Sequence, residues 1–219
     1  MRYSSMRNLD ISNGEGVGVS LFVQGCPFHC KNCFNSDTWD FNGGKEWTEE
    51  TKNRFLELID RPYIKRVSLL GGECLAEQNL DGVLDLIRTI REKYPISQNV
   101  NLENPYKSRV LEPQNDKEIH ISFPEKTIWL YTGFRWNEIM NYKIKADLCE
   151  DNISFEKHIK EDLSMIKRKN IISNVNVLVD GEYIDEQKDL TLKWRGSKNQ
   201  HVIDVKQSLA QNKTILYCD

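Results

Sequence analysis

The amino-acid sequence predicts an α/β protein built around a parallel sheet. Four short apolar runs rich in β-branched residues each end at or just before a glycine, as buried strands do when they stop at a tight turn; they are residues 17–24, 66–70, 127–131 and 175–180. Apolar residues at helical spacing separate the first three of them. Strands that alternate with helices favour a parallel sheet, and ligands of such sheets bind at the carboxyl ends of the strands.

Two helices are predicted between these strands. The first should begin after Thr48, whose hydroxyl can cap it, with Glu49 and Glu50 at the positive end of its dipole. The second should end before Tyr94-Pro95. Its apolar face is predicted from five residues at helical spacing: Leu80, Val83, Leu84, Ile87 and Ile90.

Two segments depart from the alternation, within what we expect to be a single domain over residues 1–219. Residues 97–126 are polar and aperiodic, which predicts an insertion. Residues 141–171 are charged and are predicted to be a second insertion that forms a surface helix packed on the sheet. Four apolar residues, four, four and three positions apart, would make that contact: Phe155, Ile159, Leu163 and Ile166.

Composition excludes several classes of function. The formal net charge is −3 and acidic and basic residues are mixed, so we expect no direct contact with nucleic acid. Apolar runs are far shorter than the roughly 20 residues that a membrane span needs, so no membrane association is expected. The first 16 residues lack the apolar core of a secretory signal, and we therefore expect a cytoplasmic protein with reduced thiols.

Three of the six cysteines form a cluster, Cys26-x3-Cys30-x2-Cys33, whereas Cys74, Cys149 and Cys218 are isolated. A structural zinc site would need a fourth ligand. His29 is a poor candidate for it, because it would have to bind beside its own chain neighbour. A [4Fe-4S] cluster held by three thiolates fits better, because it leaves one iron open for a ligand that is not protein. A zinc-stabilised binding module remains the alternative.

Three candidate site elements should meet at one edge of the sheet. The cysteine loop follows the first strand, Gly71-Gly72-Glu73 follows the second, and residues 131–133 follow the third. Carboxyl ends of parallel strands share an edge, so these turns should surround one pocket.

The cysteine spacing together with Gly71-Gly72-Glu73 resembles the radical S-adenosylmethionine superfamily. The resemblance implies a partial (β/α) barrel, with cluster and cofactor at the carboxyl ends of the strands. It also implies that the three cysteines hold a [4Fe-4S] cluster whose fourth iron binds the methionine part of S-adenosylmethionine. The glycine-glycine-acid turn would contact the amino group of that cofactor, since glycines permit close backbone approach and a carboxylate attracts a cationic amine.

More of the chain resembles one branch, the activating proteins of anaerobic ribonucleoside-triphosphate reductase. The matching stretches are NGEGVGVSLFVQGC, CFNSDTW, IWLYTGF, NVLVDGEYI and LKWRGSKNQHVIDV. The resemblance implies reductive cleavage of S-adenosylmethionine and transfer of a radical to a glycine of the large reductase subunit, with flavodoxin or ferredoxin as electron donor. An activase of another glycyl-radical enzyme, of the pyruvate formate-lyase type, is the alternative within this class.

The remaining site residues follow from the same resemblance. Asn32 stands where many superfamily members carry an aromatic residue beside the adenine, and Phe34 would supply the stacking surface instead. Cys33 and Thr132 complete the expected cofactor site, although Thr132 could equally end its strand. Arg195 could pair with a carboxylate of the cofactor or partner, or lie on a solvated surface. Cys74 is expected to be a buried free thiol.

Overall fold

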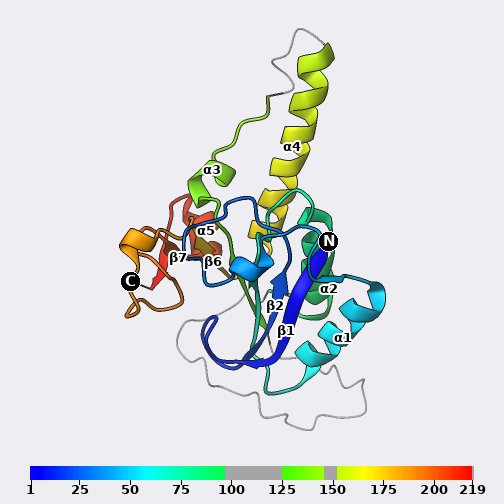
Figure 1. The fold of residues 1–219 in the computed structure, drawn as a ribbon, viewed down its shortest axis with the longest axis vertical. Helices are drawn as coiled ribbons and strands as arrows, with labels where there is room; N and C mark the ends of the chain where they lie inside the picture. The colour runs from blue at the N-terminus through cyan, green and yellow to red at the C-terminus, as the bar shows by residue number, and fades with distance from the viewer. Residues whose placement is uncertain (97–124, 146–151, 219) are drawn as a thin grey trace, which may run out of the picture.

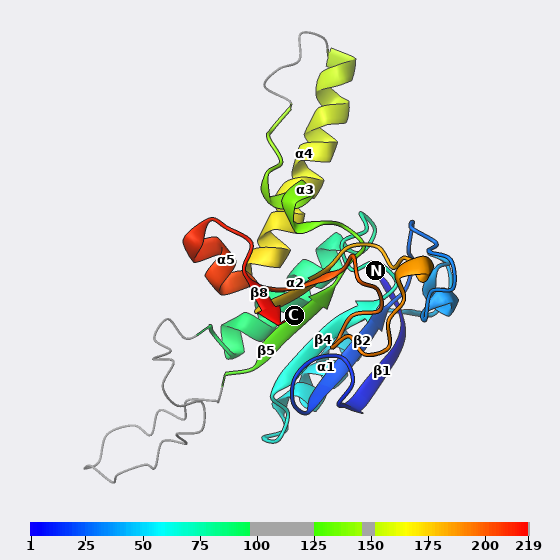
Figure 2. The same cartoon turned by 90° about the vertical axis from the view of Figure 1, so that its left-hand side faces the viewer.

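The computed structural model describes residues 1–96, 125–145 and 152–218. Within these ranges the chain forms one mixed sheet in the order β3-β1-β2-β4-β5-β6-β7-β8 (Figures 1 and 2). The inner strands β2, β4, β5 and β6 are parallel, and antiparallel strands flank them on both sides. The strands are β1 (Arg2–Asp10), β2 (Gly18–Val23), β3 (Lys45–Glu46), β4 (Arg66–Gly71), β5 (Thr127–Tyr131), β6 (Val177–Asp180), β7 (His201–Asp204) and β8 (Leu216–Cys218).

The four parallel strands are the four that the sequence predicts, but the sheet is not wholly parallel. The longest strand absent from the prediction is β1, which pairs with β2 through two shifts of register. Its apolar residues Tyr3, Met6 and Leu9 fall at every third position. This spacing hides the two-residue alternation by which half-buried strands are recognised.

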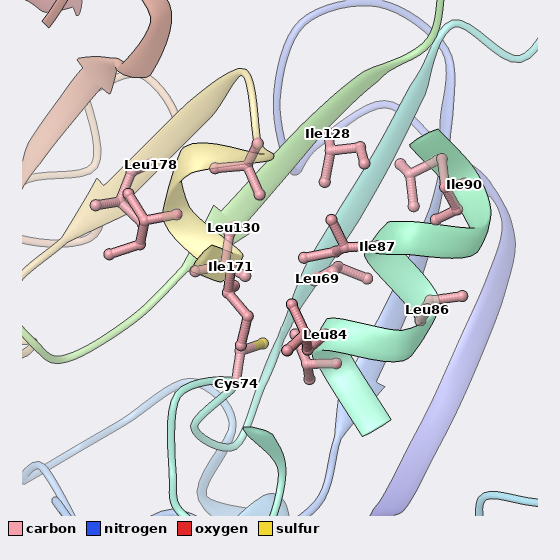
Figure 3. Packing of buried hydrophobic residues seen from close by; sticks show 14 of the residues in the cluster. Leu69, Cys74, Leu84, Leu86, Ile87, Ile90, Ile128, Leu130, Ile171 and Leu178 are labelled. Atoms are coloured by element: carbon pink, nitrogen blue, oxygen red, sulfur yellow. The ribbon is translucent and has the colours of Figure 1, made fainter. Parts of the chain in front are cut away.

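Helices pack on one face of the sheet and enclose the main core (Figure 3). Both predicted helices are confirmed: the backbone N–H of Thr51 donates to the Thr48 hydroxyl at 3.2 Å, and all five apolar residues predicted for the second helix are buried. Cys74 is fully buried in this core and is a free thiol, as expected. The helices are α1 (Glu49–Asp60), α2 (Leu80–Lys93), α3 (Trp136–Met140), α4 (Asn152–Ser173) and α5 (Val205–Gln211).

A buried ion pair lies on the face of the sheet opposite the helices, between Arg66 on β4 and Asp10 at the end of β1. Arg66 on β4 donates to the Asp10 carboxylate and to the Asp10 carbonyl oxygen, both at 2.8 Å. Asp10 also accepts hydrogen bonds from the backbone N–H groups of Ser12 and Asn13. The ion pair therefore fixes the turn between β1 and β2 against this face, because an unpaired buried charge would be costly.

The long helix α4 is confirmed, but its predicted packing is wrong. Ile159, Leu163 and Ile166 are 36%, 54% and 42% exposed, and both views show the N-terminal part of α4 extending beyond the body of the molecule (Figures 1 and 2). Its C-terminal turns pack instead, so the spacing identified the helix but not its buried side. The buried residues are Asp162, Met165, Ile171 and Ile172.

Several expectations fall outside the described residues. These are nearly all of the insertion at 97–126, Cys149 and the side chain of Phe155. Among the helices that the structure describes, none is both long and apolar enough to cross a bilayer.

Candidate active site

The cysteine loop leaves β2 through a tight turn at Gly25. This glycine has a φ of 93°, and a Cβ there would lie 2.1 Å from the Phe41 ring. The backbone N–H of Cys33 donates to the Cys30 carbonyl at 3.1 Å, which keeps the loop compact. His29 stacks on Trp39 with ring centroids 4.8 Å apart. The histidine therefore has a packing role, in agreement with its rejection as a metal ligand.

All three cysteines line one cavity of about 630 Å³, a size typical of small-molecule and cofactor sites. The Gly71-Gly72-Glu73 turn and the Tyr131-Thr132-Gly133 turn also line it, so the predicted meeting of three strand ends is confirmed. The loop after β6, Gly181-Glu182-Tyr183, is a fourth wall that the site prediction omitted. The signal was present, because the sequence showed this fourth strand ending at glycine like the others.

The glycines after β4 allow the turn to touch the cysteine loop. The backbone N–H of Glu73 donates to the Gly25 carbonyl at 2.8 Å, and that of Gly72 donates to the Val23 carbonyl at 2.9 Å. A Cβ on Gly72 would lie 2.4 Å from the Gly25 carbonyl oxygen, closer than van der Waals contact permits. Gly71, with a φ of 106°, supplies the bend before it.

We expect Gly72→Ala to displace the turn from the cysteine loop. The added Cβ would collide with backbone atoms of Gly25, which cannot move aside as a flexible side chain can. The free energy of unfolding should fall by about 1–3 kcal/mol, and the affinity for S-adenosylmethionine should fall as well. Thermal unfolding and equilibrium binding measure the two effects. Gly82→Ala is the matched control, because the three heavy atoms nearest to its Cβ would all belong to the flexible Met1 side chain. Equal behaviour of the two variants would contradict the close approach.

The Glu73 carboxylate binds protein donors from two loops. Its Oε1 accepts from the Leu75 backbone N–H and the Thr132 hydroxyl, both at 2.7 Å, and its Oε2 accepts from the Gly133 backbone N–H at 2.8 Å. A carboxylate has about four acceptor positions, so one remains on Oε2. Burial raises the pKa of Glu73 to about 7, although these hydrogen bonds and the nearby Arg168 oppose the shift. The side chain therefore joins the turns after β4 and β5, a role the sequence did not suggest.

Three other predicted residues differ in their placement. Phe34 lines the cavity and its ring lies 5.5 Å from that of Tyr183. Asn32 is not among the lining residues, and its amide donates to Asp185 outside the cavity at 2.7 Å. The Thr132 hydroxyl donates to Glu73 and accepts from the Phe134 backbone N–H at 3.1 Å, which favours a role in shaping the turn.

The donor set fits an iron–sulfur cluster. Burial raises the pKa of the Cys26 thiol to about 11 and also raises that of Cys30, and neighbouring acidic groups act in the same direction. A cationic iron centre would replace the protons of these thiols. In the part of the chain that the structure describes, no three His, Cys, Asp or Glu side chains are arranged for a single metal ion. A cluster differs from such a site because each thiolate binds a different iron.

Comparison with known families agrees with this donor set. A family described as the 4Fe-4S single cluster domain matches residues 12–120 and 116–203, and the chain belongs to this family. The sequence-based prediction of a [4Fe-4S] protein is thereby confirmed, in preference to the zinc module.

Among iron–sulfur proteins, the chain is similar to activating proteins of one kind. The chain is 29% identical over 204 residues to the anaerobic ribonucleoside-triphosphate reductase-activating protein of Salmonella typhi, covering 92% of this chain and 97% of that one. Proteins of the same name from Escherichia coli (strain K12) and Enterobacteria phage T4 are each 28% identical over 204 residues. The alignments cover 92% of this chain and, respectively, 97% and 93% of those proteins. These relatives confirm the resemblance to that family of activating proteins.

Proposed function

We propose that this chain is the activase of an anaerobic ribonucleoside-triphosphate reductase. It would bind a [4Fe-4S] cluster and S-adenosylmethionine and act on the large, glycyl-radical subunit. The observation that carries the proposal is the convergence of three cysteines and the glycine-rich strand ends on one cavity. This chain matches relatives that are named as activating proteins over nearly their whole length, and their names support the reductase as its partner.

In this proposal Cys26, Cys30 and Cys33 hold the cluster. When bound, the cluster and cofactor together supply reductive cleavage of the sulfonium and a radical that removes hydrogen from a glycine of the partner. The chain binds and orients them and excludes water. The cofactor is assigned to the seven residues that the sequence suggested, of which six line the cavity and Asn32 does not: Asn32, Cys33, Phe34, Gly71, Gly72, Glu73 and Thr132.

Two finer expectations belong to the same proposal. The four parallel strands and their shared cavity support a partial (β/α) barrel. Flavodoxin or ferredoxin is proposed as the electron donor, on the family resemblance alone. An activase of the pyruvate formate-lyase type would need a similar cavity, but the names of the relatives favour the reductase.

The proposed activity is tested with anaerobically reconstituted protein, dithionite, S-adenosylmethionine and purified reductase. We expect an electron paramagnetic resonance signal of a glycyl radical on the large subunit, together with 5′-deoxyadenosine. A pyruvate formate-lyase-type enzyme serves as the alternative acceptor. A signal on that enzyme alone would contradict the assignment of the partner, and no cofactor cleavage with either acceptor would contradict the activity.

A further inference from the structure

Arg195 lines the cavity without a partner of its own. Its guanidinium makes no hydrogen bond or ion pair with any described residue, and its Nε is buried. Buried polar groups are nearly always hydrogen-bonded, so such an exception requires an explanation. The other arginine of the cavity wall, Arg7, differs because it stacks on the Phe22 ring and lies 3.5 Å from the Asp10 carboxylate.

The residues after Arg195 form a scaffold that holds its loop in place. The Gln200 side chain accepts from the backbone N–H groups of Gly196 and Ser197 at 2.8 and 3.1 Å, and it donates to the Gly181 carbonyl at 2.8 Å. Asn199 donates to the Glu182 carbonyl at 2.8 Å. These bonds tie the loop to the cavity wall after β6 and leave the Arg195 guanidinium unused.

The residue before Arg195 is held in a strained conformation. Trp194 has a φ of 57°, in the left-handed region that bulky side chains rarely adopt. Its ring packs against Trp129 and Tyr217, with centroids 4.9 and 6.1 Å away. Strain of this kind persists only where the surroundings impose it, and it is frequent at ligand-binding sites. Arg195 is therefore fixed from both sides.

We propose that Arg195 binds the carboxylate of the methionine part of S-adenosylmethionine. The inference rests on the proposed function, which supplies the cofactor. A guanidinium pairs best with a carboxylate, and this cofactor carries one. Glu73, a buried carboxylate of the same cavity wall, forms no ion pair with Arg195 in the structure, and its oxygens bind Leu75, Thr132 and Gly133. A cofactor is favoured over a partner protein because the buried Nε lies on the same cavity as the cysteines.

The test is equilibrium binding of S-adenosylmethionine and of its decarboxylated analogue to the cluster-loaded protein. We expect Arg195→Gln to raise the Kd for S-adenosylmethionine by about 10–100-fold, as loss of a charge-assisted pair does. The Kd for the analogue should change less than twofold. Arg195→Lys keeps the charge but loses the fork, and its effect should be intermediate. The matched control is Lys193→Gln, which removes a nearby exposed charge.

Two outcomes would overturn the inference. If Arg195→Gln, with iron content and circular dichroism unchanged, binds S-adenosylmethionine like the wild type, Arg195 does not contact the cofactor. A defect seen only with reductase present would then assign the side chain to the partner. Equal weakening for cofactor and analogue would mean that the loop, not the carboxylate pair, is affected. The wild type tests the proposed function separately, because a cluster-loaded protein that binds neither compound would contradict that function itself.

Discussion

Replacement of Cys30 by alanine should abolish assembly of the [4Fe-4S] cluster and all cleavage of S-adenosylmethionine. The cavity offers three thiols, and loss of one leaves two irons rather than one without a protein ligand. We expect about four irons and four sulfides per wild-type chain and a small residue of both in the variant. Iron and sulfide content, and 5′-deoxyadenosine released under dithionite, measure the two effects.

The other described cysteines provide the controls for Cys30→Ala. Cys74 lies in the helix-covered core (Figure 3), and Cys218 is in the edge strand β8; neither lines the cavity. Cys74→Ala and Cys218→Ala should therefore keep the full cluster. If Cys74→Ala lost the cluster without unfolding, that thiol would be a ligand and the three-cysteine site would be wrong. Uptake of one zinc ion by the wild type in place of iron would likewise contradict the cluster.

The sequence predicted the parallel centre of the fold because buried strands and amphipathic helices have strong local patterns. It did not predict the antiparallel edges, since β1 is half-exposed and irregular in register, and β3 has two residues. The sequence also could not predict which face of α4 is buried. Which side of α4 is buried depends on the position of the helix relative to α2 and the sheet, and this is decided by tertiary structure.

The candidate site was predictable where the chemistry is local. The three cysteines lie close together in the sequence, and each glycine turn directly follows a predicted strand. The sequence suggested a cofactor or partner carboxylate, or solvent, for Arg195, but it could not place Trp194 and Arg195 on the cavity wall, because they reach it through a loop held by Gln200. Contacts between distant segments of this kind leave no periodic signal. These residues belong to the stretch LKWRGSKNQHVIDV, which carries the family resemblance, but only the structure shows that the Asn199 and Gln200 side chains hold the loop.

The largest expected effect outside the cysteines is that of Glu73→Ala. Among the described residues, Glu73 is the only acceptor for three donors on the turns after β4 and β5, and removal of its carboxylate leaves them buried and unpaired. We expect the free energy of unfolding to fall by about 3–5 kcal/mol. The affinity for S-adenosylmethionine should fall too, because the two turns form adjoining walls of the cavity. Urea unfolding and equilibrium binding measure these losses.

Glu77→Ala is the matched control for Glu73→Ala, because in the part of the chain that the structure describes its exposed carboxylate pairs only with Lys160, at 3.0 Å on the surface. Such a pair contributes about 0–1 kcal/mol. Equal losses in the two variants would contradict the bridging role of Glu73.

Glu73→Gln tests the electrostatics of the same group. The pKa of Glu73 is raised from 4.5 to about 7 by burial, so the folded chain binds more protons than the unfolded chain between these values. The stability from this group is fully present below pH 4.5 and is lost as the pH rises through 7. In the cluster-free protein, the stability of the wild type relative to Glu73→Gln should fall by about 3 kcal/mol across this window. A constant difference would mean that the three donors keep the carboxylate ionised, so that its role is to hold the two turns together at every pH in the window.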